Sequence, residues 1–162
     1  MDMPVLKPIL IPTQGLPFFK RLWALITVVR KWEVSENWFY DLPNGKRIVI
    51  PKGFVFDGAS IPKPLWGFLS PTGLLMVAGL IHDYSYRYAY LWAIDDTGNA
   101  YKYKYKKGTR QDYDELFKKV NIAVNGMVVV DTVATWMLKA FGHIAWNKHR
   151  KTYSPPIVPV LR

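Results

Sequence analysis

Residues 32–50 read WEVSENWFYDLPNGKRIVI, a hairpin pattern from which the rest of the fold can be inferred. Two runs rich in apolar and aromatic residues, 32–40 and 47–50, flank the hexapeptide DLPNGK. Asn44-Gly45 supplies the left-handed backbone that a tight turn between antiparallel strands needs. Val55 and Phe56 follow as a further candidate strand, so the sequence predicts a small antiparallel β-sheet.

The segments upstream and at the far end of the chain predict extended structure. Residues 22–29 are mostly leucine, aromatic and β-branched residues, and we expect a strand there. Residues 1–21 contain four prolines and residues 153–162 contain three, which disfavour helices. We therefore predict an N-terminal arm (1–21), a single domain (22–152) and a C-terminal arm (153–162). Each arm either packs on the domain or is held by a partner.

Downstream of the sheet the pattern predicts helices. Residues 74–92, 110–124 and 127–149 suit helices, with a loop or hairpin at 95–108. The predicted fold class is α+β, a small antiparallel β-sheet followed by about three helices. The chain has 162 residues, half of them hydrophobic, which is enough for one domain with a core.

The amino-acid composition excludes some kinds of site. The chain has no cysteine, which excludes disulfides and thiolate metal sites. Its beginning lacks the basic and then apolar pattern of a signal peptide, and no stretch is predicted to span a membrane. The formal net charge of +10 either attracts nucleic acid, anionic lipid or an acidic protein, or only keeps a small domain soluble.

Lysines and tyrosines alternate in residues 101–107, which read YKYKYKK. On a strand the tyrosines share one face and most lysines the other. Lys102, Lys104, Lys106 and Lys107 could then bind the phosphates of nucleic acid or anionic lipid. The same alternation is also typical of a half-buried strand with solvated lysines.

The strongest candidate for chemistry is His82 with its neighbour Asp83. On a helix His82 and Tyr86 lie on one face, whereas Asp83 is rotated by about 100°. A histidine base needs an acceptor that holds its tautomer, and Asp114 on the next predicted helix is the candidate. A packed imidazole beside a surface acid is the alternative interpretation.

A second candidate is the loop Asp57-Gly58-Ala59-Ser60. It combines a carboxylate, backbone amides and a hydroxyl, so it could bind a cation, an oxyanion or a helix end. It could equally be a turn in which Asp57 and Ser60 satisfy backbone donors. We expect the loop to lie near the first half of the His82 helix.

Three segments resemble a family of phage and prophage proteins known as domain of unknown function 1353. They are residues 50–62, residues 81–86 with Arg110 and 114–117, and residues 137–146. The resemblance covers roughly residues 30–150. It implies a phage or prophage origin, and hence location in the host cytoplasm or the virion.

The pattern His82-Asp83-x-x-Tyr86-x-x-Ala89 is also similar to the active-site helix of phospholipases A2. This resemblance implies that His82 is the general base, that Asp114 orients it and that Tyr86 supports Asp114. It further implies that Asp83 binds Ca²⁺, with Asp57 and its loop in place of the glycine-rich calcium loop of those enzymes.

Two functions are therefore expected. The first is a virion-associated hydrolase that cleaves a lipid or cell-envelope ester. The second is a non-catalytic structural or accessory virion protein, of the tail or capsid, whose arms and basic surface contact neighbouring subunits. A third and weaker interpretation is an intracellular effector that inhibits a host factor.

Overall fold

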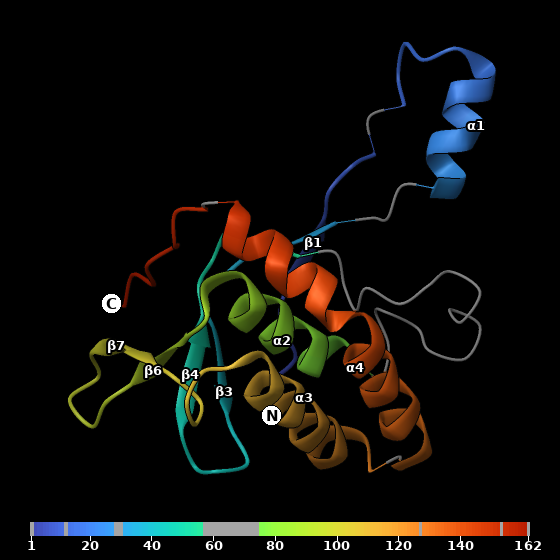
Figure 1. Cartoon of the computed structure of the whole chain (residues 1–162). Helices are drawn as coiled ribbons and strands as arrows, with labels where there is room; N and C mark the ends of the chain where they lie inside the picture. The colour runs from blue at the N-terminus through green and yellow to red at the C-terminus, as the bar shows by residue number, and fades with distance from the viewer. Residues whose placement is uncertain are drawn as a thin grey trace.

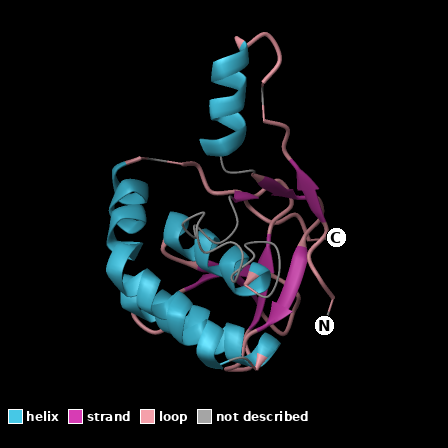
Figure 2. Ribbon diagram, turned by 90° about the vertical axis from the view of Figure 1, so that its right-hand side faces the viewer, coloured by secondary structure: helices cyan, strands magenta, loops and turns pink. Residues whose placement is uncertain are grey.

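The computed structural model describes residues 2–11, 13–27, 31–56, 75–126, 128–152 and 154–161. Helices α2, α3 and α4 gather on one side of the body and the strands on the other (Figures 1 and 2). The elements in chain order are β1 (Leu6–Pro8), α1 (Phe18–Thr27), β2 (Trp32–Val34), β3 (Trp38–Asp41), β4 (Arg47–Ile50), β5 (Val55–Phe56), α2 (Met76–Tyr88), β6 (Leu91–Ile94), β7 (Ala100–Tyr103), α3 (Arg110–Asn125) and α4 (Val128–Lys151).

The described strands form two antiparallel sheets, which confirms the predicted α+β class. One sheet has the order β1-β2-β5 and the other the order β3-β4-β6-β7. The predicted hairpin joins β3 to β4, with Trp38 paired to Ile50. Gly45 adopts a φ of +79°, and the Leu42 N–H donates to the Lys46 carbonyl at 2.8 Å, as a tight turn requires.

The single strand considered for residues 32–40 is wrong, since the chain changes sheets within it. β2 pairs with β1 and β5, whereas β3 pairs with β4. Between them Asn37 accepts a hydrogen bond from the Lys52 N–H at 2.9 Å through Oδ1. A side chain that bonds backbone in this way competes with continued strand pairing.

The strand predicted at residues 22–29 is also wrong, because residues up to Thr27 belong to helix α1. Phe18 and Leu22, like Phe19 and Trp23, are four residues apart and share a helical face. This spacing is a helical period, and the β-propensity of the individual residues did not reveal it. The helix begins directly after Pro17, a position that tolerates proline because the first helical amides have no internal partner.

The helix expected over residues 74–92 ends earlier, at Tyr88. Ala89 takes a left-handed conformation with a φ of +59°, and its N–H bonds the Ser85 carbonyl. The apolar residues that follow become β6, which lies between β4 and β7 inside the larger sheet. The helices predicted at 110–124 and 127–149 are confirmed as α3 and α4, within two residues at each end.

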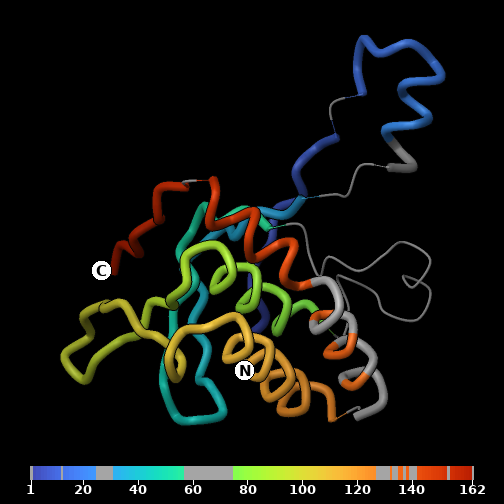
Figure 3. Tube along the Cα trace, viewed as in Figure 1, coloured from blue at the N-terminus to red at the C-terminus, as the bar shows by residue number. Residues whose placement is uncertain are grey.

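Both terminal segments pack on the protein itself. Near the N-terminus β1 pairs with β2, and the Trp38 indole donates to the Asp2 carbonyl at 2.8 Å. Near the C-terminus the Trp92 indole donates to the Ile157 carbonyl at 2.9 Å. The trace of residues 154–161 therefore stays beside the body, whereas α1 stands away from it (Figure 3).

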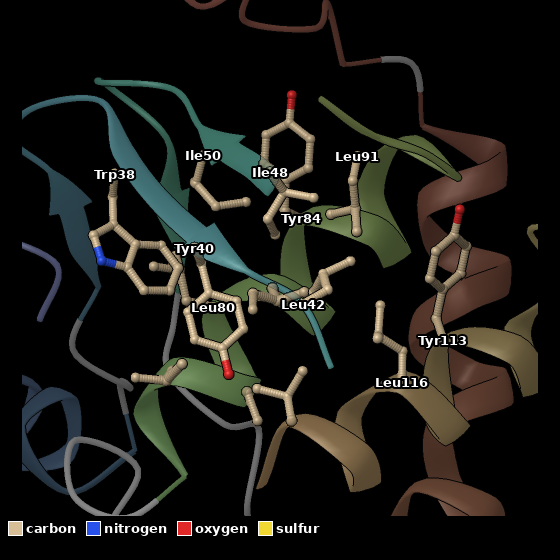
Figure 4. Close-up of a cluster of buried hydrophobic side chains, with 14 of the residues drawn as sticks. Trp38, Tyr40, Leu42, Ile48, Ile50, Leu80, Tyr84, Leu91, Tyr113 and Leu116 are labelled. Carbon is tan, nitrogen blue, oxygen red and sulfur yellow. The ribbon is translucent and has the colours of Figure 1, made fainter. Parts of the chain in front are cut away.

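The core lies between the strands and helix α2. The Phe54 ring lies 4.8 Å from the Tyr84 ring of α2, measured between centroids. Ile48, Ile50 and Leu91 of the larger sheet are buried with them (Figure 4). Because this core fixes one face of α2, the opposite side of the helix is held against α3 and α4, where the candidate site lies.

Candidate functional site

Helix α2 presents His82 and Tyr86 together. The two residues are one turn apart, and their ring centroids lie 3.8 Å apart. His82 is only 6% exposed, and the Phe117 ring of α3 meets the imidazole edge-on at 5.3 Å. A polar ring in such surroundings is costly unless its nitrogens are hydrogen-bonded.

Helix α3 supplies the partner of His82, as the sequence predicts. Its start is set by a capping box, in which the Thr109 side chain accepts from the Asp112 N–H and Asp112 bonds back to the Thr109 N–H. This start places Asp114 in the second turn, facing α2. His82 Nε2 lies 3.1 Å from Asp114 Oδ1, and Asp114 is 5% exposed.

Two further donors hold the Asp114 carboxylate. The Tyr86 hydroxyl donates to the same oxygen as His82, and Arg110 Nη1 donates to Oδ2 at 3.0 Å. A buried carboxylate is tolerated only when charge and hydrogen bonds compensate for lost water. Arg110, one helical turn before Asp114, provides that charge. Its i,i+4 spacing was a usable signal in the sequence, yet Arg110 was not among the predicted site residues.

The arrangement determines the protonation of His82. An ionised carboxylate only accepts hydrogen bonds, so the proton shared with Asp114 resides on Nε2. The other ring nitrogen, Nδ1, then carries a lone pair that can accept a proton. Burial lowers the pKa of His82 below its ordinary value, against the opposing effect of Asp114. The imidazole is therefore neutral near pH 7 and available as a base.

Helix α4 closes the site from a third side. The Trp146 ring meets the Tyr86 ring edge-on at 5.3 Å. Gly142 packs so closely that a Cβ there would lie 2.6 Å from the Tyr86 hydroxyl and 3.4 Å from Arg110 Nη1. Arg110 Nη1 also reaches the Leu138 carbonyl at 3.4 Å. The sequence offered no signal for Gly142, since its role depends on how α4 crosses α2.

Burial raises the pKa of Tyr86, and the Asp114 carboxylate raises it further. The phenol consequently stays protonated near neutral pH and donates to Asp114. Tyr86, His82 and Arg110 thus form one network around Asp114. This agrees with the predicted grouping of His82, Asp114 and Tyr86.

The predicted metal ligands are not brought together by the described residues. Asp83 is half-buried on α2, next to His82 in the chain. Asp57, Gly58, Ala59 and Ser60 lie outside the described residues. Within the described ranges no group of three or more histidine and acidic side chains could hold a metal ion. Calcium binding stays a prediction that depends on Asp57 and its loop.

The basic stretch forms an edge strand, β7, and the turn after it. Lys102, Lys104 and Lys107 are exposed, and the Lys102 ammonium lies 5.0 Å from the centre of the Tyr90 ring. Lys106 is paired with Glu115 of α3. The alternation thus places tyrosines partly inside and lysines outside, as for an ordinary half-buried strand. Binding of phosphate groups by these lysines stays a prediction.

The fold and the site define an α+β protein with a buried histidine–carboxylate pair where three helices meet. The model of the family described as "Protein of unknown function (DUF1353)" matches residues 32–141. The chain belongs to this family, which confirms the resemblance seen in the sequence. The match includes His82, Tyr86, Arg110 and Asp114.

One curated relative is "Uncharacterized protein y4jT" of Sinorhizobium fredii (strain NBRC 101917 / NGR234). It is 38% identical over 55 residues, which make up 33% of this chain and 16% of that protein. The similarity thus spans only a small part of the relative's length. No solved structure matches the chain significantly.

Proposed function

We propose that the protein is a phage-encoded, virion-associated hydrolase in which His82 is the general base and the substrate is a lipid or cell-envelope ester. The observation that carries the proposal is the 3.1 Å contact between His82 Nε2 and Asp114 Oδ1. It directs the basic lone pair of Nδ1 away from the carboxylate. The ester substrate and the phage setting are supported by the resemblances in the sequence.

In the proposed reaction Nδ1 takes a proton from water while the water oxygen bonds to the ester carbonyl carbon. The tetrahedral intermediate then breaks the bond from carbon to the alcohol oxygen. His82 returns its proton to that oxygen, so a carboxylic acid and an alcohol leave. Asp114 stabilises the transient imidazolium, and Arg110 and Tyr86 hold Asp114 in place.

Calcium would assist this step if Asp83 and Asp57 hold it. Ca²⁺ prefers six to eight oxygen ligands, and among the described residues Asp83 is the only predicted ligand. If Ca²⁺ binds, it would polarise the carbonyl of the ester. A calorimetric calcium titration of the wild type and of Asp83→Asn measures binding independently of activity.

The decisive experiment measures fatty-acid release from phosphatidylcholine and phosphatidylglycerol vesicles, and hydrolysis of a soluble nitrophenyl ester, with and without Ca²⁺. His82→Gln should lower the rate by about 100-fold or more. His143→Gln is the matched control, since His143 is exposed on α4. A wild type that hydrolyses none of these esters, or a fully active His82→Gln variant, would refute the proposal.

A second candidate, a non-catalytic accessory virion protein, is favoured by the burial of the network. His82 and Asp114 join α2 to α3, and Arg110 joins α3 to α4. On this view His82→Gln lowers stability while the wild type has no hydrolytic activity. Mass spectrometry of purified phage particles tests the virion location that both candidates share.

A further inference from the structure

Helix α1 is the part of the described chain that has least contact with the rest. Figures 1 and 2 both show it standing off the body at the end of two connecting segments. Arg21 of α1 makes a local hydrogen bond, from Nε to the Thr13 carbonyl at 3.3 Å. A ten-residue helix is only marginally stable in water unless it packs against something. We therefore expect another surface to cover α1.

The apolar face of α1 is exposed and aromatic. Phe18, Phe19 and Trp23 are 72%, 80% and 69% exposed, and Leu22 lies beside them. The pairs Phe18–Leu22 and Phe19–Trp23 are each one turn apart, so the four side chains form one continuous stripe. Contiguous exposed apolar surface of this kind marks an interaction site.

The charge around the stripe is of one sign. Lys20 and Arg21 lie on the other side of the helix and are exposed. Residues 16–31 contain no aspartate or glutamate, while Arg30 and Lys31 follow the helix in the sequence. The whole chain carries a formal net charge of +10. A short helix that has aromatic and leucine residues on one face, and whose only charged side chains are cations, matches the headgroup region of an anionic bilayer.

We propose that α1 is a membrane-surface anchor that lies in the headgroup layer of an anionic lipid bilayer. Phe18, Phe19, Leu22 and Trp23 would enter the acyl boundary while Lys20 and Arg21 meet lipid phosphates. No helix among the described residues is long and apolar enough to cross a membrane. At about 1.5 Å per residue, α1 reaches about half of the ~30 Å hydrocarbon thickness, so it lies on the surface.

This inference does not rest on His82 or on any activity. It uses a different surface from the lysines of β7, and the two can be separated by mutation. Binding of α1 to an apolar groove on a partner protein is a different mode, because such a protein does not have to carry negative charge.

The test is flotation of the full chain with vesicles of phosphatidylcholine alone and of phosphatidylcholine with equimolar phosphatidylglycerol. Binding should require the anionic lipid and weaken with added salt. Phe19→Ser/Trp23→Ser should lower the partition coefficient by about tenfold or more, because two large apolar side chains leave the bilayer. The matched control is Trp136→Ser/Ile144→Ser, which removes two exposed apolar residues of α4.

A second pair of variants separates the basic surfaces. Lys20→Gln/Arg21→Gln should weaken binding to anionic vesicles, and Lys102→Gln/Lys104→Gln should change it less. Equal binding by Phe19→Ser/Trp23→Ser and the wild type would overturn the proposal. So would α1-dependent self-association in sedimentation with no vesicle binding, which would assign the stripe to a second copy of the chain.

Discussion

Replacing Gly142 by alanine should destabilise the protein, although alanine is normally the better helix former. The substitution gains about 1 kcal/mol of helix propensity within α4. The new Cβ, however, would lie 2.6 Å from the Tyr86 hydroxyl, and contacts under 3.0 Å essentially never occur. The hydroxyl must therefore move away from Asp114, or α4 must move away from α2.

The cost can be estimated from the contacts. A hydrogen bond to an ionised group contributes about 1.5–3 kcal/mol, and overpacking a filled interior costs about 1–3 kcal/mol. Since these losses overlap, we take about 3 kcal/mol and subtract the helix gain of about 1 kcal/mol. A net loss of about 2 kcal/mol should lower the Tm by about 4–8 °C for a chain of this size.

Thermal and urea unfolding of four proteins test this in a double-mutant cycle. They are the wild type, Gly142→Ala, Tyr86→Phe and the double variant. Without the hydroxyl, the nearest atoms to the new Cβ are Arg110 Nη1 at 3.4 Å and the Cζ of residue 86 at 3.6 Å. Gly142→Ala should then be neutral or stabilising. If alanine stabilises the wild type as much as the Tyr86→Phe protein, the reasoning is refuted.

Three further predictions concern other contacts. The free energy of unfolding should fall as the pH drops below about 6.5, because burial lowers the folded-state pKa of His82 and the unfolded chain binds the proton first. Urea unfolding between about pH 5 and about pH 8 measures how steeply the free energy of unfolding changes with pH. This slope should be smaller in His82→Gln than in the wild type, and equal slopes would contradict the prediction. Arg150→Ala should lower the free energy of unfolding by about 1–2 kcal/mol, since Arg150 Nη2 donates at 2.6 Å to two carbonyls at the end of α2. Thermal unfolding measures this loss, and Lys151→Ala, as the control, should leave the stability unchanged. Trp92→Phe should loosen the C-terminal segment, because it removes the shorter of the two hydrogen bonds to the Ile157 carbonyl and leaves the one from Tyr84. Carboxypeptidase should then trim the chain about fivefold faster, and an unchanged rate would contradict the prediction.

Local patterns in the chain were sufficient for several features. Asn44-Gly45 specifies its turn because a glycine can take the positive φ that the turn needs. The apolar spacing of α3 and α4 predicts both helices, and Thr109 with Asp112 marks where α3 begins. The pairing of His82 with Asp114 could be anticipated because a buried imidazole needs an acceptor and Asp114 lies in the second turn of the adjacent helix.

Other features were not predicted from the sequence. Composition favoured a strand for residues 22–29, although the four-residue spacing of Phe18 with Leu22 and of Phe19 with Trp23, which is a local pattern, indicates the helix that the structure has up to Thr27. The end of α2 at Tyr88 follows from the place of β6 inside a sheet, which no local pattern encodes.

The candidate site also combines features that local sequence patterns predict with features that only the tertiary structure reveals. The chain order places His82, Tyr86 and Asp114 on helical faces, because helical periodicity is a local property. Arg110 as the counter-charge could have been recognised from its i,i+4 spacing to Asp114. Gly142, which leaves room for the Tyr86 hydroxyl, emerges only when α4 packs across α2. Close packing and charge compensation are properties of the assembled interior, and the order of residues along the chain does not state them.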